Sequence, residues 1–583
     1  MAMDPVTIQI LWNRLVSVVD EAATGLMRTA YTPSVKDYHD FCCALFDRDA
    51  RMLAHSTVTT AGFLGIVPEV MRNFIAKFPP ETLKPGDAII TNDPWAASGH
   101  LMDISIAAPI FYREKLVGYA LCIVHHLDMG GRMSTLESKD MYEEGLKIPI
   151  LKLYEGGKLN EQIYEFIRAN IRVSEKVLGD VRAQQVANHV CTQGLLRCLE
   201  EFGMEDLTEL SGEIITRTEA SLRQKIARIP DGTYRNEVRL PPIPGCDDTI
   251  DIKVAVTIAG DGVVIDYTGS SGEVGAAVNC TLNMTRSYSA YPIKLALDPS
   301  VPNNEGGLRP IKVIAPEGSV LNCRPPAATW GRTMISHLYP EIIFATMESV
   351  MADSLLASNG GSPANEVYLH GRDKEGRNFL AIEQHAGGFG ASPRYDGYST
   401  LCFPNNTANI PVEVAENEAP IVHLKKELVA DSGGPGTQRG GLGQEVAIRI
   451  LDGDLGPDGF VEGSIRLSGR TEDGPFPVFG RLGGGLGRGG ELTVNEEPVH
   501  HGIYRRFYPG DTIRFVIGGG GGYGDPLQRP RELVAEDVRQ GYVTPEGAAR
   551  DYGFDSDGQG PAVVPEGPGQ SRSKEVTGVA SDD

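Results

Sequence analysis

The sequence has few basic residues for its length, and it lacks the segments that mark several protein classes. Its 583 residues include 54 Lys and Arg against 77 Asp and Glu, which gives a formal net charge of -23. A nucleic-acid partner needs a basic surface that displaces counterions, so this balance argues against one. No apolar run reaches the roughly 18 residues of a membrane helix, and no basic segment precedes an apolar one at the N-terminus. We therefore expect neither a membrane segment nor a signal peptide.

The short motifs of several enzyme classes are also missing. Neither the G-x-x-x-x-G-K-[ST] loop of ATP-binding enzymes nor the G-x-S-x-G turn of serine hydrolases occurs. The nine cysteines include no Cys-x-x-Cys pair, which argues against a zinc ribbon and fits reduced thiols in a cytoplasmic protein. A literal G-x-G-x-x-G match begins at Gly485, but the segment after it reads as a strand, where a dinucleotide site needs a helix. We expect no nucleotide cofactor on this chain.

Glycine is abundant: 69 of the 583 residues are glycine, a larger share than the ordinary one of about 7%. The excess indicates many turns and short strands. Apolar periodicity and turn residues predict a helix from Asp4-Pro5, strands between Asp40 and Val124 with one helix at 68–78, helices over 160–229, a hairpin turning at Asp261-Gly262 and a helix over 334–356. We predict an α+β fold. Its regions are an N-terminal α/β region over 1–229 that carries a candidate metal site, a mixed, β-rich region over 230–411, a β-rich, glycine-rich region over 412–557 and a disordered tail over 558–583.

Histidine is scarce, with 12 residues, and several of these lie close to acids. His100 and Asp103 precede one predicted strand, whereas His125, His126 and Asp128 close the next. Two strands joined by a short connection are expected to pair antiparallel, which brings the start of the first beside the end of the second. His100, Asp103 and either His125 or His126 would then meet. Such a set suits a Mn, Fe or Zn ion, although residues of these types at strand ends commonly cap or hydrogen-bond instead.

Several longer stretches carry a resemblance to a known family. In order, from about residue 5 to 554, they are DFCCALFD at Asp40, PGDAIITNDPW, GHLMD, HHLDMGG, EEGLKIPILKLYEGGKLNE, ANIRVSEKVLGDVRAQQVAN, DSGGPGTQRGGLG and GGGGGYGDPLQRPRELVAEDVRQGYVT. The chain resembles the hydantoinase B family. This family includes the second half of ATP-dependent 5-oxoprolinase, the B subunits of N-methylhydantoinase and caprolactamase, and the large subunits of acetone and acetophenone carboxylases.

The resemblance implies a site and a division of labour between two subunits. It implies a divalent metal ion, Mn, Zn or Fe, held by Asp40, His100, Asp103 and His125. It therefore favours His125 over His126 as the ligand. In the family, a partner A subunit binds ATP and phosphorylates the substrate oxygen, and the B subunit completes the reaction at its metal. The metal would supply the attacking hydroxide by lowering the pKa of bound water.

Other polar residues near the implied ligands are candidates for supporting roles. We take His126 and Asp128 as candidate catalytic residues; Glu144 is a further possible acid or base, but structural hydrogen bonds explain it better. Arg132 and Lys139 are candidates for holding phosphate, with a solvated surface charge as the default. His385 and Asn92-Asp93 are better explained as loop-fixing residues. The chain reads A-S-G-H-L-M-D where the family more often has G-G-T-H-L-P-D, so the ligand types stay while the pocket wall differs.

The resemblance predicts the B-type subunit of a cytoplasmic, ATP-dependent amidohydrolase that opens a lactam, hydantoin or 5-oxoproline-like ring. It also implies an A-type partner in an assembly of two A and two B chains. One alternative is a subunit of a ketone carboxylase of the acetone or acetophenone type; its large subunits tend to be longer, so the compact length favours hydrolysis. A second alternative is a noncatalytic scaffold that stabilises the A subunit, in which the histidine cluster is structural.

Overall fold

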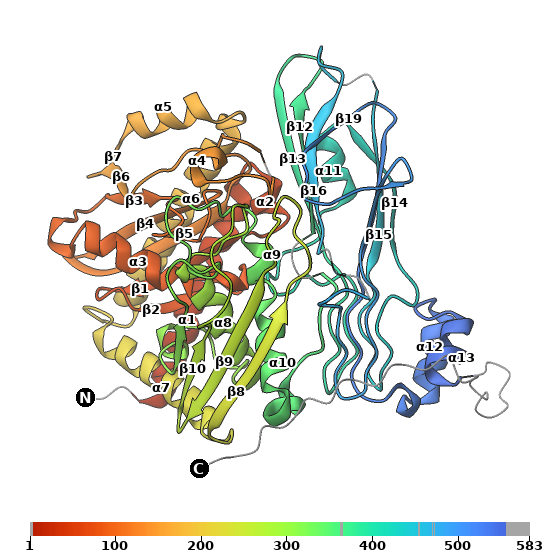
Figure 1. The fold of residues 1–583 in the computed structure, drawn as a ribbon. Helices are drawn as coiled ribbons and strands as arrows, with labels where there is room; N and C mark the ends of the chain where they lie inside the picture. The colour runs from red at the N-terminus through yellow and green to blue at the C-terminus, as the bar shows by residue number, and fades with distance from the viewer. Residues whose placement is uncertain are drawn as a thin grey trace.

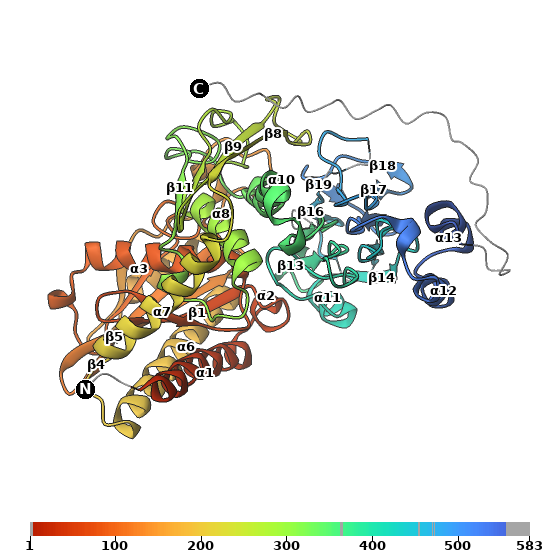
Figure 2. The same cartoon turned by 90° about the horizontal axis from the view of Figure 1, so that it is seen from below.

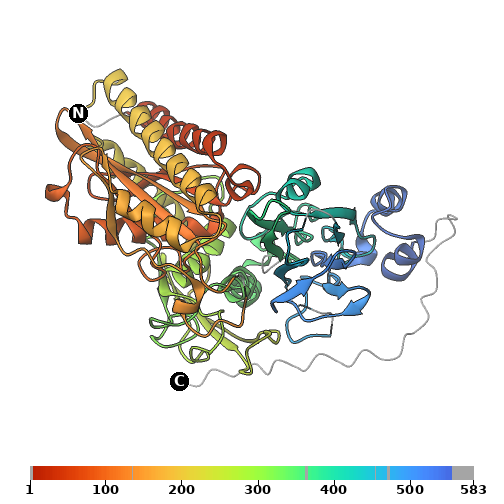
Figure 3. The same cartoon turned by 90° about the horizontal axis from the view of Figure 1, so that it is seen from above.

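The computed structural model describes residues 4–133, 135–361, 365–452, 455–468, 470 and 473–554, in two halves of different construction (Figure 1). The N-terminal half, up to residue 361, holds most of the helices, whereas the C-terminal half, from residue 365, is built mainly of strands and extended segments. Figure 3 shows the two halves lying side by side. The predicted tail over 558–583 lies outside the described residues.

The elements include many of those predicted from the sequence. The helices are α1 (Pro5–Thr29), α2 (Pro33–Lys36), α3 (Ile66–Lys77), α4 (Met141–Glu144), α5 (Glu161–Asn170), α6 (Ser174–Glu201), α7 (Thr208–Ile226), α8 (Leu282–Leu297), α9 (Thr333–Ser336), α10 (Tyr339–Met351), α11 (Val412–Glu418), α12 (Arg531–Arg539) and α13 (Pro545–Tyr552). The strands are β1 (Phe41–Asp47), β2 (Met52–His55), β3 (Ala88–Thr91), β4 (Asp103–Tyr112), β5 (Lys115–His125), β6 (Leu151–Glu155), β7 (Lys158–Leu159), β8 (Gly232–Arg239), β9 (Asp251–Ala259), β10 (Gly262–Asp266), β11 (Ile311–Ile314), β12 (Asn365–Arg372), β13 (Asn378–His385), β14 (Ile421–Leu428), β15 (Gln444–Ile450), β16 (Val461–Arg466), β17 (Glu491–Val494), β18 (Glu497–Pro498), β19 (Arg505–Phe507) and β20 (Thr512–Ile517). The predicted α+β class is confirmed.

A seven-stranded sheet in the order β2-β1-β5-β4-β3-β6-β7 organises the N-terminal half. The long helices α1 and α6 lie side by side against one face of it (Figure 2). Asp4 starts α1 as predicted, because its side chain accepts the free amides of Val6 and Thr7. Along β5, Cys122 and Val124 join the core under α1 and α6, whereas Leu121 and Ile123 join the larger core on the opposite face. This alternation decides which side chains at the end of β5 reach the site.

The central segment adds a second, four-stranded sheet in the order β11-β10-β9-β8, against which α8 and α10 pack. The predicted hairpin is present as β9 and β10, with Gly260 and Asp261 as its two turn residues. The helix predicted over 334–356 is divided into α9 and α10.

The C-terminal half contains a sheet in the order β13-β12-β16-β19 and another in the order β14-β15-β20-β17-β18. The first sheet joins strands from both sides of the predicted boundary at residue 411, because β12 pairs with β16. The domain boundaries predicted at residues 229 and 411 stay predictions. As expected, the strand β17 follows the glycine motif at Gly485.

The glycine clusters of the C-terminal half lie side by side as extended segments. Composition predicts turns at glycines, but many of these glycines do not mark turns. The amide of Gly434 donates to Gly520 O at 2.7 Å, and the amide of Gly520 donates to Gly441 O at 2.9 Å. A Cβ atom added to Gly440 would lie 1.9 Å from Gly520 O. Glycine is needed here because neighbouring backbones approach too closely for any side chain.

Two further features of the described residues concern membrane helices and disulfides. Across the described ranges, no helix combines the length and the apolar character that crossing a membrane requires. All nine cysteines lie in described segments, and none is paired in a disulfide.

Candidate metal centre

The pairing of three neighbouring strands brings the predicted ligands together. The strands β1, β5 and β4 are adjacent, and the register places Asp103 directly opposite His125. Asp40 immediately precedes β1, and its carbonyl oxygen accepts the amide of His125 at 3.0 Å. The predicted antiparallel pairing of β4 with β5 is therefore confirmed. Asp40, His125 and Asp103 form a row at one end of the sheet, while His100 comes from the loop that enters β4.

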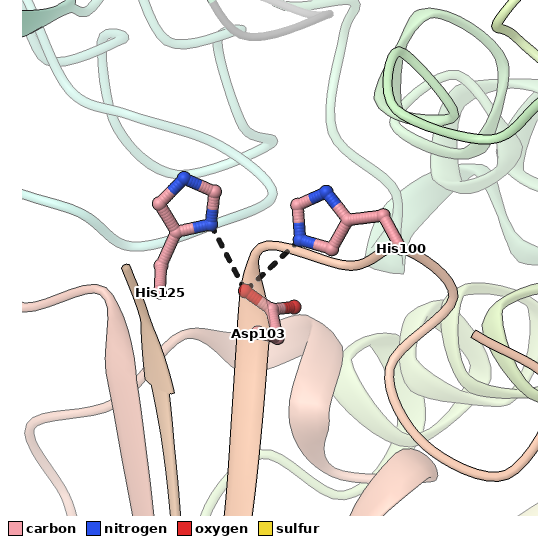
Figure 4. A group of neighbouring side chains, drawn as sticks. All are labelled: His100, Asp103 and His125. Carbon is pink, nitrogen blue, oxygen red and sulfur yellow. Dashed lines mark hydrogen bonds and ion pairs between the residues drawn. The ribbon is translucent and has the colours of Figure 1, made fainter. Parts of the chain in front are cut away.

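One carboxylate oxygen lies between two imidazole rings (Figure 4). Asp103 Oδ1 is 2.9 Å from His125 Nδ1 and 2.9 Å from His100 Nε2. The three side chains are buried, with 4% of His100, 1% of Asp103 and 7% of His125 exposed. One possible ligand atom from each lies within 4.8 Å of the others. This convergence of two imidazoles and a carboxylate is the geometry that the sequence predicted.

Burial and neighbouring charge set the protonation of this group. Burial lowers the pKa of His100 to about 3, helped by the charge of Arg332, so its ring is neutral near pH 7. Burial alone would raise the pKa of Asp103, but the two imidazoles and the Arg332 guanidinium hold it well below its usual range. Burial also opposes the charged form of His125, yet its hydrogen bond to Asp103 raises the pKa of that ring. A neutral imidazole beside an ionised carboxylate suits metal binding.

The residues present fit a divalent metal ion. His100 Nδ1 and His125 Nε2 have no hydrogen-bond partner among the described residues, and His100 Nε2 has only its contact with Asp103. Buried imidazole nitrogens ordinarily have partners, so these atoms need an explanation, and a ligated ion would supply one. The lining of two nitrogens and carboxylate oxygens matches the donor preferences of Zn, Mn and Fe.

Asp40 lies beside this group and is held separately. Its Oδ2 atom is 4.0 Å from His125 Nδ1, and its Oδ1 atom accepts the hydroxyl of Thr60 at 2.8 Å. Burial raises the pKa of this carboxyl. Asp40 therefore lines the same cavity, at the edge of the His100, Asp103 and His125 group.

The cavity at this group draws its walls from both halves of the molecule. The cavity has a volume of about 30 Å³, which is room for an ion with a water molecule. Arg332 reaches in from the N-terminal half, where it donates to Asp103 Oδ2 at 3.2 Å and to Ser98 O at 3.0 Å. Glu366 and Arg466 line it from neighbouring strands of the C-terminal half.

The structure places His126 and Asp128 away from this cavity. His126 Nε2 lies 3.3 Å from Gln184 Oε1 of α6, on the sheet face opposite to His125. Asp128 accepts the amides of Gly130 and Arg172 at 2.8 and 2.6 Å. Neither side chain lines the cavity, so their placement argues against direct contact with a group bound there. Strand alternation also gives a physical reason for preferring His125 to His126.

Glu144 fixes the chain that leads to Arg332. It accepts the amides of Thr329 and Trp330 at 2.8 and 2.7 Å, which is the structural role that the sequence favoured. Burial raises its pKa to about 7, against these hydrogen bonds.

The remaining sequence candidates make local contacts. Arg132 lies near Glu137 and Glu143 at the surface, and Lys139 donates to Gly275 O at 2.8 Å. Asn92 accepts the amide of Ile148 at 2.6 Å, as expected of a residue that fixes a loop.

His385 is buried, and its Nε2 atom lies 3.3 Å from Glu383 Oε2. Asp93 pairs with Lys147 at 3.4 Å. None of these sequence candidates lines the cavity at His100, Asp103 and His125.

Sequence reasoning missed much of the cavity wall. These residues, Tyr288, Trp330, Arg332, Glu366, Tyr368, Asn405 and Arg466, come from segments far from the histidines. No local motif marks them, since only the packing of the two halves brings them to the site. Glu366 and Arg466 stand near the ends of β12 and β16, whose mixed polar and apolar sequences give no signal that marks them.

Comparison with known proteins now gives the class. The family model of hydantoinase B/oxoprolinase matches residues 4–526. The chain belongs to the hydantoinase B/oxoprolinase family, which confirms the family predicted from its motifs.

Relatives and solved structures agree with this assignment. The caprolactamase subunit beta of Pseudomonas jessenii is 27% identical over 572 residues, covering 96% of this chain and 97% of the relative. A chain in the crystal structure of the ATP-dependent caprolactamase from that organism has a TM-score of 0.84 at 25% identity, over 96% of this chain and 98% of its own length.

Another relative differs in length, and a further solved structure shares the fold. A 5-oxoprolinase of Pestalotiopsis fici is 28% identical over 556 residues, which span 90% of this chain but 42% of the relative. A chain of an acetone carboxylase solved without nucleotide has a TM-score of 0.80 at 20% identity, over 95% of this chain and 81% of its own length, which shows a shared fold.

Proposed function

We propose that this protein is the hydantoinase B-type subunit of a cytoplasmic, ATP-dependent amidohydrolase that opens a cyclic amide such as a lactam, a hydantoin or 5-oxoproline. The observation that carries the proposal is the buried convergence of His100, Asp103 and His125 at the paired ends of β4 and β5. Family membership adds the reaction class, because relatives are named caprolactamase and 5-oxoprolinase.

The energy source would lie on a second chain. No G-x-x-x-x-G-K-[ST] motif occurs in the sequence, and the caprolactamase relative is named as one subunit. The 5-oxoprolinase relative is more than twice as long as the matched stretch. We therefore infer an A-type partner that binds ATP and phosphorylates the substrate oxygen, in an assembly of two A and two B chains.

The chain's own residues would hold the metal ion and orient its ligands. His100, Asp103 and His125, with Asp40 at their edge, would hold a Mn, Zn or Fe ion, which would supply Lewis acidity to activate water and to polarise the carbon under attack. The two imidazoles, with Arg332, keep the Asp103 carboxylate ionised, and Arg332 orients it through its 3.2 Å contact. Thr60 orients Asp40 in the same way. Burial of the cavity excludes bulk water, which strengthens each of these interactions.

The ketone carboxylase is the second candidate function, favoured by the acetone carboxylase fold match. The caprolactamase match has the higher TM-score and identity, so hydrolysis is the better supported of the two. A noncatalytic scaffold is a third hypothesis, but it leaves the unpartnered imidazole nitrogens without an explanation.

Co-expression of the chain with its A-type partner tests the proposal. The purified complex is incubated with ATP and with lactams, hydantoins or ketones, in the presence and absence of bicarbonate. We expect ATP-dependent ring opening of a cyclic amide that bicarbonate does not affect. Bicarbonate-dependent loss of a ketone, without ring opening of any amide, would reject the hydrolase in favour of the carboxylase.

A further inference from the structure

The guanidinium of Arg466 is buried in the cavity wall and only partly satisfied. It is 3% exposed, at the end of β16, and one of its nitrogens, Nη2, donates to Glu366 on the neighbouring strand. Its Nε and Nη1 atoms have no hydrogen-bond partner among the described residues. Arginine carries five N–H bonds in a rigid fork, so three of them remain without an acceptor. Glu366 balances the charge of this buried cation, but the free N–H bonds call for further acceptor atoms.

Arg470 shows what a satisfied buried arginine looks like in the same part of the chain. Its guanidinium donates to Glu341 Oε2 at 2.8 Å, to Asn359 O at 3.1 Å and to Phe476 O at 3.1 Å, and it is 1% exposed. Arg470 therefore serves as a structural cross-link. Arg466 differs from it because its free donors border a cavity.

Neighbouring residues hold Arg466 in one position. Its guanidinium lies over the ring of Trp330, 4.8 Å from the ring centroid, and Glu366 fixes Nη2 from the side. Trp330 belongs to the segment that also carries Arg332, so the two guanidiniums line one cavity from opposite halves. After burial, their charges are the next causes that lower the pKa of His337 well below its usual value. Two guanidiniums therefore stand on the wall beside the histidine and aspartate group, Arg332 against Asp103 and Arg466 against Glu366.

We propose that Arg466 binds the phosphoryl group of the activated substrate, with its free N–H bonds directed at phosphoryl oxygens. The planar fork of arginine matches two oxygens of a tetrahedral oxyanion. Asp103 already engages Arg332, which leaves Arg466 as the guanidinium with donors to spare. This inference rests on the proposed function for the identity of the ligand, since a phosphorylated amide is what an A-type partner would deliver. Arg132 and Lys139, the phosphate candidates from the sequence, lie outside the cavity.

Binding of inorganic phosphate to the full-length chain tests the inference without the partner or a ring substrate. Calorimetric titration compares the wild type with Arg466→Met and Arg466→Lys, each before and after removal of metal by a chelator. We expect Arg466→Met to weaken phosphate binding at least tenfold in both states. Arg466→Lys keeps the charge without the fork, so we expect an intermediate loss.

Arg506 provides the matched control. It lies on β19 of the same sheet, pairs with Glu462 at 3.0 Å and is more than half exposed, so Arg506→Met removes the same charge away from the cavity. We expect it to bind phosphate as the wild type does. Circular dichroism establishes that each variant is folded; should Arg466→Met not fold, Arg466→Gln takes its place.

Three results would overturn the inference. They are wild-type chain that does not bind phosphate, Arg466→Met that binds it as tightly as the wild type, and Arg506→Met that weakens binding equally. Bicarbonate serves as a second probe, and a chain that binds bicarbonate through Arg466 but not phosphate would contradict the phosphoryl assignment. Because no turnover is measured, loss of phosphate binding in Arg466→Met would stand even where ring opening is never found. Conversely, ring opening by the complex together with unchanged phosphate binding in Arg466→Met would reject only the role of Arg466 and leave the proposed function standing.

Discussion

The two halves of the molecule obtain their structure in opposite ways. In the N-terminal half, side chains alternate across a seven-stranded sheet, and this alternation selects His125 for the cavity and turns His126 towards α6. In the C-terminal half, glycine clusters let backbones pack so closely that a Cβ on Gly440 would meet Gly520 O at 1.9 Å. One half depends on which side chain is present, and the other depends on having none.

The cavity lies where these two kinds of construction meet. The N-terminal half brings imidazole and carboxylate groups together at strand ends, and the C-terminal half contributes Glu366 and Arg466 from two paired strands. A site formed this way is sensitive to side-chain chemistry on one side and to backbone spacing on the other. The following changes test each dependence in turn.

The largest effect is expected from the adjacent histidines at the end of β5. His125→Gln removes a proposed metal ligand, so we expect the bound metal to be lost and ring opening in the complex to fall on the order of 1000-fold, about 4 kcal/mol of activation free energy. His126→Gln is the matched control, because its side chain faces Gln184 outside the cavity. Metal content and kcat/KM are measured for both. Equal losses in the two variants would contradict the assignment of His125.

The next effect is expected in the glycine-rich half. Gly440→Ala places a methyl group against the carbonyl oxygen of Gly520, and backbone cannot move aside as a flexible side chain can. We expect the free energy of unfolding to fall by about 3 kcal/mol or more. Urea unfolding followed by circular dichroism measures it. A variant as stable as the wild type would show that the clusters are ordinary loops.

A pH effect of similar size is expected from Glu144. Burial raises its folded pKa from 4.5 to about 7, so the folded state holds this proton more tightly than the unfolded chain does. The stabilisation is complete below pH 4.5 and is lost as the pH rises to 7, which corresponds to on the order of 3 kcal/mol. Glu144→Gln keeps an acceptor for the amides of Thr329 and Trp330 but cannot titrate. Unfolding of both proteins across this range should diverge as the pH rises; parallel curves would contradict the raised pKa.

The smallest effect sharpens the contrast between glycines. Gly212 lies inside α7, and a Cβ added there meets nothing within 4 Å. We expect Gly212→Ala to stabilise the protein by about 0.5–1 kcal/mol, because alanine loses less backbone freedom in a helix. The same urea measurement used for Gly440→Ala gives the value. Destabilisation here would mean that glycine is required in the helical half for a reason other than spacing.

Local pattern predicted the part of the site that depends on short connections. The few residues between β4 and β5 forced antiparallel pairing, and this alone brought Asp103 opposite His125. Alternation along β5 also separates His125 from His126, a step that the bare spacing left open. The contacts of Arg332 and Arg466 could not be predicted, because they depend on how segments a hundred or more residues apart pack together. For the same reason, composition could not show that many of the clustered glycines serve close packing.

Metal content of the purified chain tests the central claim most directly. We predict one tightly bound divalent ion per wild-type chain by elemental analysis. We also predict that His100→Ala loses both this ion and ring-opening activity in the complex with the A-type partner. A wild-type chain that binds no stoichiometric metal, together with a His100→Ala variant that keeps full activity, would contradict the account and leave the scaffold hypothesis in its place.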